Sequence, residues 1–345
     1  MKNIILLLMV LLILSNCTKK ETDFEVFSKF SQELTVDGTK IDLKPGISFP
    51  VELEMLDSVF VLINLDGDYF FDLYSNINFT FINNVLPKGK GPNEEIFVEP
   101  YVKYIKDNIF LYSNSYSVNI VEYLMKEKSL LSLKKYKLTG ELFDLQDAFI
   151  IGDNIIGHFI DKSTSREFVE YNVNTHKVTD FGSEFPYYKE IPNSKNNTIF
   201  QKISAVKPDK EKIATVYGFF PILKIHSSDG ELIKEVRYLN NQSFPDALVD
   251  DNPSEEKRRS LERCYAKIEV TDNYIYALYS GRKSGDVQSG LNDISNVIHV
   301  WDWNGNPIKK IILNRDLFSF CVAKDDSYLI CSSLNEPDFI YKYEL

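Results

Sequence analysis

The chain has 345 residues, of which 44% are hydrophobic and 26% are charged, and this composition indicates a globular protein with an apolar core and excludes a disordered chain. Its net charge of −11 at pH 7 excludes nucleic acid as a partner, because a nucleic-acid-binding surface must be basic to neutralise phosphates. The 24 Phe and 20 Tyr residues favour β-strands, where aromatic side chains pack on a pleated, half-buried surface.

The amino terminus has the pattern of an export signal. Lys2 precedes an unbroken apolar run from Ile4 to Leu14. A bilayer-spanning helix needs about 20 apolar residues, so this run is too short to span but suits the core of a signal peptide. The run ends in Leu14-Ser15-Asn16-Cys17, which resembles the bacterial lipobox, although Asn16 stands where Gly, Ala or Ser is usual. In a lipobox the cysteine is diacylated and becomes the first residue after cleavage.

We therefore expect three segments: a lipoprotein signal peptide over residues 1–16, a tether over residues 17–31, and a folded body over residues 32–345. Lipidation of Cys17 would make the membrane a partner through the acyl anchor and place the protein in the cell envelope, at the outer membrane of a Gram-negative bacterium. Ordinary secretion, with cleavage near Ser15, is the alternative.

Beyond the tether, one pattern of strand, short turn, strand, polar turn and further strand recurs in six units of about 35 to 50 residues, the size of propeller blades. The units cover residues 49–83, 102–138, 142–181, 203–239, 266–313 and 318–345. The sequence thus predicts an all-β fold, a six-bladed β-propeller. Two β-sandwich domains joined by the polar segment Lys189–Thr198 are the alternative architecture.

Val297–Leu313, in the fifth unit, is the clearest of these repeats. Two strands are joined at Asn304-Gly305, which supplies the positive φ angles that a tight, twist-matched hairpin turn needs. The first strand is mostly apolar on both faces, so both faces must be covered, as in blades packed face to face. One face carries Val297, His299, Trp301 and Trp303, and the other carries Ile298, Val300 and Asp302.

The last unit has three strands and would leave an open edge. We expect a strand from the N-terminal region, either Glu33–Val36 or Lys40–Leu43, to complete the sixth blade and close the ring. A single helix is predicted before the fifth unit, capped by Asn252 and continuing to Arg263.

The segment Pro87-Lys88-Gly89-Lys90-Gly91-Pro92-Asn93-Glu94-Glu95 resembles the Gly-x-Gly-Pro-Gly-Glu loop that follows the first blade in TolB-like six-bladed β-propeller lipoproteins. Asn93 stands where that family has Gly, and Asn also tolerates positive φ. The Trp301–Pro307 hairpin and Ile340–Tyr343 resemble the family's last two blades. This resemblance, over Ile47–Leu345, implies the propeller and the anchor, and it implies no activity.

No catalytic, cofactor or metal site is predicted. The four histidines lack ligand spacing, and Lys88–Gly91 and Asn64–Asp68 are better interpreted as turns than as a phosphate cradle and a calcium loop. The long loop from Ser280 to Gly290 is a possible binding loop, with Arg282, Lys283 and Asp286 as its candidate residues. We expect the remaining cysteines to be buried free thiols, with a Cys321–Cys331 bridge as the alternative; these cysteines are Cys264, Cys321 and Cys331.

The function predicted from these features is a lipid-anchored binding or interaction module whose ligand is an unknown protein or carbohydrate. The alternative is a propeller enzyme, a hydrolase, lactonase or lyase acting on carbohydrate. Such an enzyme would need acidic, His or Asn side chains from several blades converging at one mouth of the channel.

Overall fold

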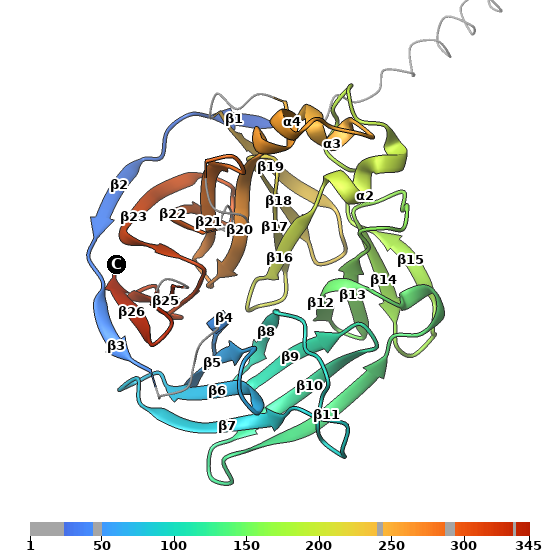
Figure 1. Cartoon of the computed structure of the whole chain (residues 1–345). Helices are drawn as coiled ribbons and strands as arrows, with labels where there is room; N and C mark the ends of the chain where they lie inside the picture. Colours follow the sequence, from blue (N-terminus) through green and yellow to red (C-terminus); the bar gives the residue numbers. More distant parts are fainter. Residues whose placement is uncertain (1–23, 44–49, 240–243, 287–293, 334–335) are drawn as a thin grey trace, which may run out of the picture.

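The computed structural model describes residues 24–43, 50–239, 244–286, 294–333 and 336–345, and in these residues the strands form six sheets set around a common axis (Figure 1). The six-bladed propeller is therefore confirmed, and the alternative of two sandwich domains is wrong. The polar segment proposed as a linker, Lys189–Thr198, lies between blades 3 and 4.

Each blade is an antiparallel meander whose innermost strand comes first in the chain, except that blade 6 takes its outermost strand from the N-terminal region. Blade 1 contains β4 (Pro50–Met55), β5 (Val59–Asn64), β6 (Tyr69–Ser75) and β7 (Phe81–Pro87). Blade 2 contains β8 (Val102–Lys106), β9 (Ile109–Asn114), β10 (Ser117–Leu124) and β11 (Ser129–Lys137). Blade 3 contains β12 (Gln146–Ile151), β13 (Asn154–His158), β14 (Phe168–Asn172) and β15 (Val178–Phe181).

Blade 4 contains β16 (Lys202–Val206), β17 (Lys212–Tyr217), β18 (Ile222–Ser227) and β19 (Leu232–Tyr238). Blade 5 contains β20 (Glu262–Val270), β21 (Tyr274–Lys283), β22 (Ser295–Asp302) and β23 (Pro307–Leu317). Blade 6 contains β24 (Ser319–Val322), β25 (Tyr328–Ser332) and β26 (Phe339–Glu344).

The hydrophobic core is divided among the interfaces between blades, which is why the strands are apolar on both faces. In β22, Trp301 and the adjoining Trp303 pack in the core between blades 4 and 5. Ile298 and Val300, on the opposite face of the same strand, pack in the core between blades 5 and 6. The two faces predicted for this strand are thus confirmed.

The turn after β22 differs from the prediction. Gly305 has φ of +82°, but Asn304 is not among the residues with positive φ. The Asp302 carboxylate accepts hydrogen bonds from the backbone N of Asn304 (2.8 Å) and of Asn306 (2.9 Å), and Gly305 N donates to Asp302 O (3.0 Å). Because Asp302 binds the turn's donors, the loop is longer than a two-residue turn and needs positive φ only at Gly305.

The N-terminal region runs along the outer edges of three consecutive blades (Figure 1). β3 (Thr39–Asp42) pairs antiparallel with β26 and completes blade 6, so the predicted closure is confirmed, with the second of the two candidate segments. The first candidate lies in β2 (Gln32–Val36), which pairs parallel with β23 as a fifth strand of blade 5. β1 (Glu25–Phe27) pairs parallel with β19 in blade 4 in the same way.

The predicted tether, residues 17–31, therefore differs from the structure in its second half, because Glu25–Phe27 belongs to a blade. Cys17 and the predicted signal peptide, residues 1–16, lie outside the described residues.

Three short α-helices occur in the described residues: α2 (Asn196–Ile199), α3 (Asp246–Val249) and α4 (Glu255–Arg259). The predicted helix up to Arg263 is too long, because the chain enters β20 at Glu262. Its cap is Ser254 and not Asn252, since Ser254 Oγ accepts a hydrogen bond from Lys257 N (3.3 Å). None of the described helices has the length and apolar character needed to cross a bilayer.

Candidate functional site: the central channel

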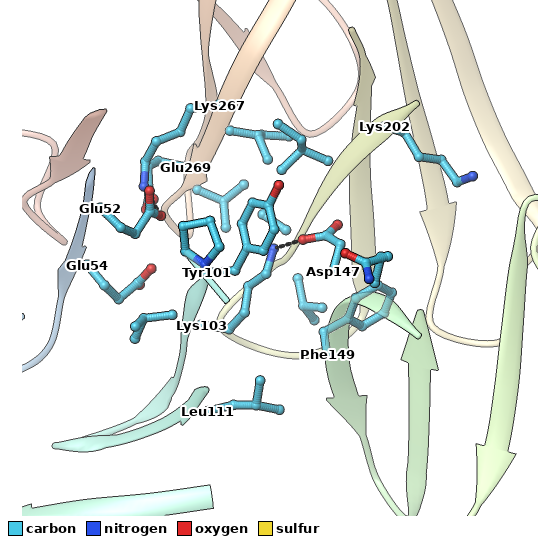
Figure 2. Close-up of a pocket in the computed structure, with 18 of the residues that line it drawn as sticks. Glu52, Glu54, Tyr101, Lys103, Leu111, Asp147, Phe149, Lys202, Lys267 and Glu269 are labelled. Carbon is cyan, nitrogen blue, oxygen red and sulfur yellow. Dashed lines mark hydrogen bonds and ion pairs between the residues drawn. The ribbon is translucent and has the colours of Figure 1, made fainter. Parts of the chain in front are cut away.

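A cavity of about 450 Å³ lies on the propeller axis (Figure 2). Its walls are the innermost strands of blades 1 to 5 (β4, β8, β12, β16 and β20), with Phe318 contributed from just before β24 of blade 6. This volume falls within the range of small-molecule binding sites.

The innermost strands place ionisable side chains in this cavity by simple alternation. In β4, Glu52 and Glu54 line the cavity, while Leu53 between them packs in an apolar core. In β20, Lys267 and Glu269 line the cavity on either side of the buried Ile268. Residues two apart share one face of a strand, so each pair is carried to the axis together.

One group of charges joins blade 5 to blade 1. Lys267 Nζ forms an ion pair with Glu52 and another with Glu269 (2.8 Å), and it donates to Leu53 O (3.0 Å). Glu54 lies beside this group, as Figure 2 shows. Three carboxyl groups, two of them ion-paired to Lys267, thus lie at this side of the cavity.

Burial raises the pKa of Glu52 to about 7, although Lys267 opposes the shift. Burial and the neighbouring Glu269 raise the pKa of Glu54 well above its usual value. For Lys267, burial acts to lower the pKa, but Glu269, Glu52 and Glu54 outweigh it and raise the pKa. The group therefore combines a charged lysine with a Glu52 carboxyl that titrates near neutral pH, and it can both donate and accept hydrogen bonds.

A second group joins blades 2, 3 and 4. Lys103 Nζ lies 2.6 Å from Asp147 Oδ1 and also donates to Ser204 O. Asp147 Oδ2 accepts from Ser204 N (2.7 Å). The dashed line in Figure 2 marks the Lys103–Asp147 pair, which faces the Glu52–Glu269 side across the cavity.

Lys202 and His158 are two further buried residues of the cavity wall. Among the described residues, Lys202 Nζ and His158 Nδ1 have no hydrogen-bond partner. Lys202 Nζ lies 5.3 Å and 5.2 Å from the ring centres of Phe168 and Phe185, and burial lowers its pKa to about 8. Burial, with Lys202 nearby, lowers the pKa of His158 well below its usual value, so this imidazole is neutral.

The cavity therefore has an acidic side and a basic side. The acidic side holds Glu52, Glu54 and Glu269 near Lys267, and the basic side holds Lys103 with Asp147. Lys202 belongs to the wall, but its Nζ points away from the cavity toward Phe168 and Phe185. Across the ranges that the structure describes, no group of three or more His, Cys, Asp or Glu side chains is placed to hold a metal ion. The arrangement is suited to binding a polar molecule through many hydrogen bonds.

The candidate binding loop lies elsewhere. Arg282 forms a two-pronged ion pair with Asp316 (3.0 and 2.5 Å), Lys283 ends β21, and Asp286 N donates to Lys283 O. None of the candidate residues Arg282, Lys283 and Asp286 lines the cavity, and residues 287–293 lie outside the described residues.

The interpretation of the Gly-rich segment after β7 as a turn is supported by its hydrogen bonds. Glu94 Oε2 accepts from Gly91 N (2.7 Å), and Gly89 N donates to Glu95 O (3.0 Å). A Cβ at Gly89 would meet the Glu94 carboxylate, so a larger residue there would displace the Glu94 side chain from this turn. Asn93 has φ of +64°, as expected for the position where the resembling loop has Gly.

The cysteine prediction is confirmed: Cys264, Cys321 and Cys331 are buried thiols that are not joined in a disulfide bond. Of the histidines, His226 and His299 are buried as well as His158, and His176 hydrogen-bonds Tyr171 at the surface. The channel residues were not predicted from the sequence. Their signal was the charged-apolar-charged order of Glu52-Leu53-Glu54 and Lys267-Ile268-Glu269 inside otherwise apolar strands.

Comparisons with known proteins agree with the fold. A family model described as TolB-like 6-blade propeller-like matches residues 26–325. A DUF4221 family member from Bacteroides vulgatus superposes with a TM-score of 0.60 at 10% identity, covering 92% of this chain and 97% of that one. A presumed exported protein from Bacteroides fragilis superposes with a TM-score of 0.55 at 12% identity, with the same coverage of 92% and 97%. No curated protein sequence matches the chain.

Proposed function

The chain belongs to the TolB-like six-bladed propeller family, and from this premise we propose that it is a lipid-anchored binding protein of the cell envelope whose central channel holds a small, hydroxyl-rich ligand such as a carbohydrate. The observation that carries this proposal is the cavity of about 450 Å³ lined by ionisable side chains from five blades.

The chemistry of the wall favours a hydroxyl-rich ligand. A sugar hydroxyl both donates and accepts hydrogen bonds, and so does a carboxyl group close to its pKa, as Glu52 is at neutral pH. On the side of the cavity that faces Glu52, Lys103 supplies an ammonium group beside the Asp147 carboxylate. Hydrogen bonds to charged groups contribute more than those between neutral groups, so this pair favours a ligand with many hydroxyls.

The proposed location rests on the sequence of the amino terminus. The apolar run Ile4–Leu14 followed by Cys17 supports export and lipidation. The similarity to a presumed exported protein from Bacteroides fragilis agrees with export.

Calorimetric titration of the full chain with maltose, cellobiose, diacetylchitobiose and galacturonic acid tests the ligand class. We expect one of these to bind and Lys103→Met, measured where the variant is folded, to weaken its binding by about tenfold or more, since a hydrogen bond to a charged group is lost. The matched control is Lys106→Met, at an exposed lysine of the same strand, β8. Equal binding by both variants, or binding of none of the sugars, would contradict the proposal.

A carbohydrate-active enzyme is the second candidate, favoured by the pKa of Glu52 near 7, which suits a general acid. An assay of the unchanged protein and of Glu52→Gln with nitrophenyl glycosides distinguishes the two functions. An enzyme would release nitrophenol and lose that activity in the variant, whereas a binding protein releases none in either form.

A further inference from the structure

Blade 4 has an exposed apolar strip on its outer rim. Phe24 is 43% exposed, Val26 is 56% exposed, Tyr187 is 63% exposed and Leu239 is 60% exposed. These four residues, called the blade 4 strip below, come from three separate parts of the chain: the β1 region, the segment after β15, and the end of β19.

Arg237 of β19 lies next to residues from two of the three parts of the strip. Val26 is its partner in the parallel β1–β19 ladder, and the Phe24 ring centre lies 3.9 Å from its guanidinium carbon. The same guanidinium lies 5.1 Å from the ring of Tyr188, next to Tyr187. Leu239 extends the ladder by donating from its backbone N to Phe27 O (2.7 Å). The Glu235 carboxylate forms an ion pair with Arg237 (2.6 Å) and neutralises its charge. The surface of the strip is therefore apolar around this ion pair.

The strip is exposed because blade 4 has more strands than blade 3 and extends beyond it at the rim. Blade 4 has five strands after β1 is added, whereas blade 3 has four and ends in the four-residue β15. On the side of β1 toward blade 5, Phe27 packs against Trp301, at 6.4 Å between ring centres. On the side toward blade 3, Val26 has no such cover and stays exposed.

We propose that the blade 4 strip docks on the lipid bilayer to which the protein is anchored, an inference that rests on the proposed acylation of Cys17. Only residues 18–23 separate Cys17 from Phe24. Seven Cα–Cα steps reach at most about 25 Å in any conformation, so the anchor holds the strip at the membrane surface. Aliphatic and aromatic side chains next to an arginine suit the boundary between headgroups and acyl chains.

Docking by the rim gives the propeller an orientation. A bilayer against blade 4 lies beside the ring and not across it, so the propeller axis runs roughly parallel to the membrane (Figure 1). Neither end of the propeller axis then faces the membrane.

The test uses the full, natively acylated chain in vesicles of phosphatidylethanolamine and phosphatidylglycerol. A fluorophore is attached to cysteine in Val26→Cys, in Leu239→Cys, or in the control Ile77→Cys. Ile77 is 86% exposed and lies in blade 1, across the ring from blade 4. The three buried cysteines, with 0% exposure, will not react in the folded protein.

We expect iodide to quench the labels at residues 26 and 239 about fivefold less than the label at residue 77, because bilayer contact shields them. If an acylated chain floats with the vesicles but iodide quenches all three labels equally, the docking proposal is wrong and the proposed lipid anchor is retained. A chain without acyl groups that does not float overturns both. If the labels lose their shielding when the ratio of protein to lipid is lowered tenfold, a second copy of the chain covers the strip. That result also overturns docking on the bilayer.

Discussion

Lys103 of blade 2 and Asp147 of blade 3 form an ion pair of 2.6 Å inside the channel wall, with side-chain exposures of 16% and 3%. The pair joins two blades whose innermost strands have no shared ladder. It lies opposite the pairing of Lys267 with Glu52 and Glu269, which joins blades 5 and 1. Charges that line the candidate binding cavity therefore also hold the blades together.

Replacement of Lys103 by Met should destabilise the protein by about 3–5 kcal/mol, because it leaves the buried Asp147 carboxylate without its cation. Urea unfolding monitored by circular dichroism measures the loss, and Lys106→Met provides the exposed control. In the double variant Lys103→Met with Asp147→Asn, the loss should be smaller than in Lys103→Met alone. A single-variant loss below about 1 kcal/mol would show that the pair does not join the blades.

Glu54→Gln should become more stable relative to the unchanged protein as the pH rises from 5 to 8. The pKa of Glu54 is raised in the folded protein, so the folded state binds more protons than the unfolded state above pH 4.5, and stability falls as pH rises. Glutamine resembles the protonated carboxyl and does not titrate. Differences in free energy of unfolding across this pH range measure the effect, with the exposed Glu141→Gln as control. A difference that does not change with pH would contradict the buried, protonated state.

Ile41→Asp should unfold the protein at clearly lower urea than the matched Leu34→Asp. Ile41 lies opposite Ile340 in the ladder that completes blade 6 and packs in its core. Leu34 lies in β2, a strand added outside a blade that already has four. Loss of the closing strand exposes an edge and part of the blade 6 core, for which we expect about 2–4 kcal/mol. Equal urea midpoints for the two variants would mean that β3 does not have this special role.

Much of the fold could be predicted from the sequence because each strand shows, in its own residues, which of its faces are apolar and must be covered. The two apolar faces of Ile298 and Trp301 require cover on both sides, and recurrence of that pattern identifies a propeller. The missing strand of the last unit likewise follows from the count of strands. The turn at Asn304 could not be predicted, because its conformation depends on the hydrogen bonds of the Asp302 side chain.

The N-terminal strands were harder to identify because their partners lie far away in the sequence. Phe27 and Phe30 are isolated in a polar segment, and their apolar partner Trp301 follows about 270 residues later. A parallel pairing such as β1 with β19 leaves no hairpin signal between the strands. The segment therefore resembled a tether.

The candidate site could not be assembled from sequence for the same reason. Glu52, Lys103, Asp147, Lys202 and Lys267 each come from a different blade, and only the closed ring brings them to one axis. The loop with Arg282 was predicted to bind a ligand because it is long and rich in Gly and Ser. In the structure Arg282 forms an ion pair with Asp316 away from the cavity.

The most direct test of the central claim, that the channel is the binding site, is hydrogen–deuterium exchange of the full chain with and without the sugar that binds in calorimetry. We expect slower exchange in β4, β8, β16 and β20, whose side chains line the cavity. Slower exchange confined to the outer strands or to Ser280–Asp286, with the innermost strands unchanged, would contradict it.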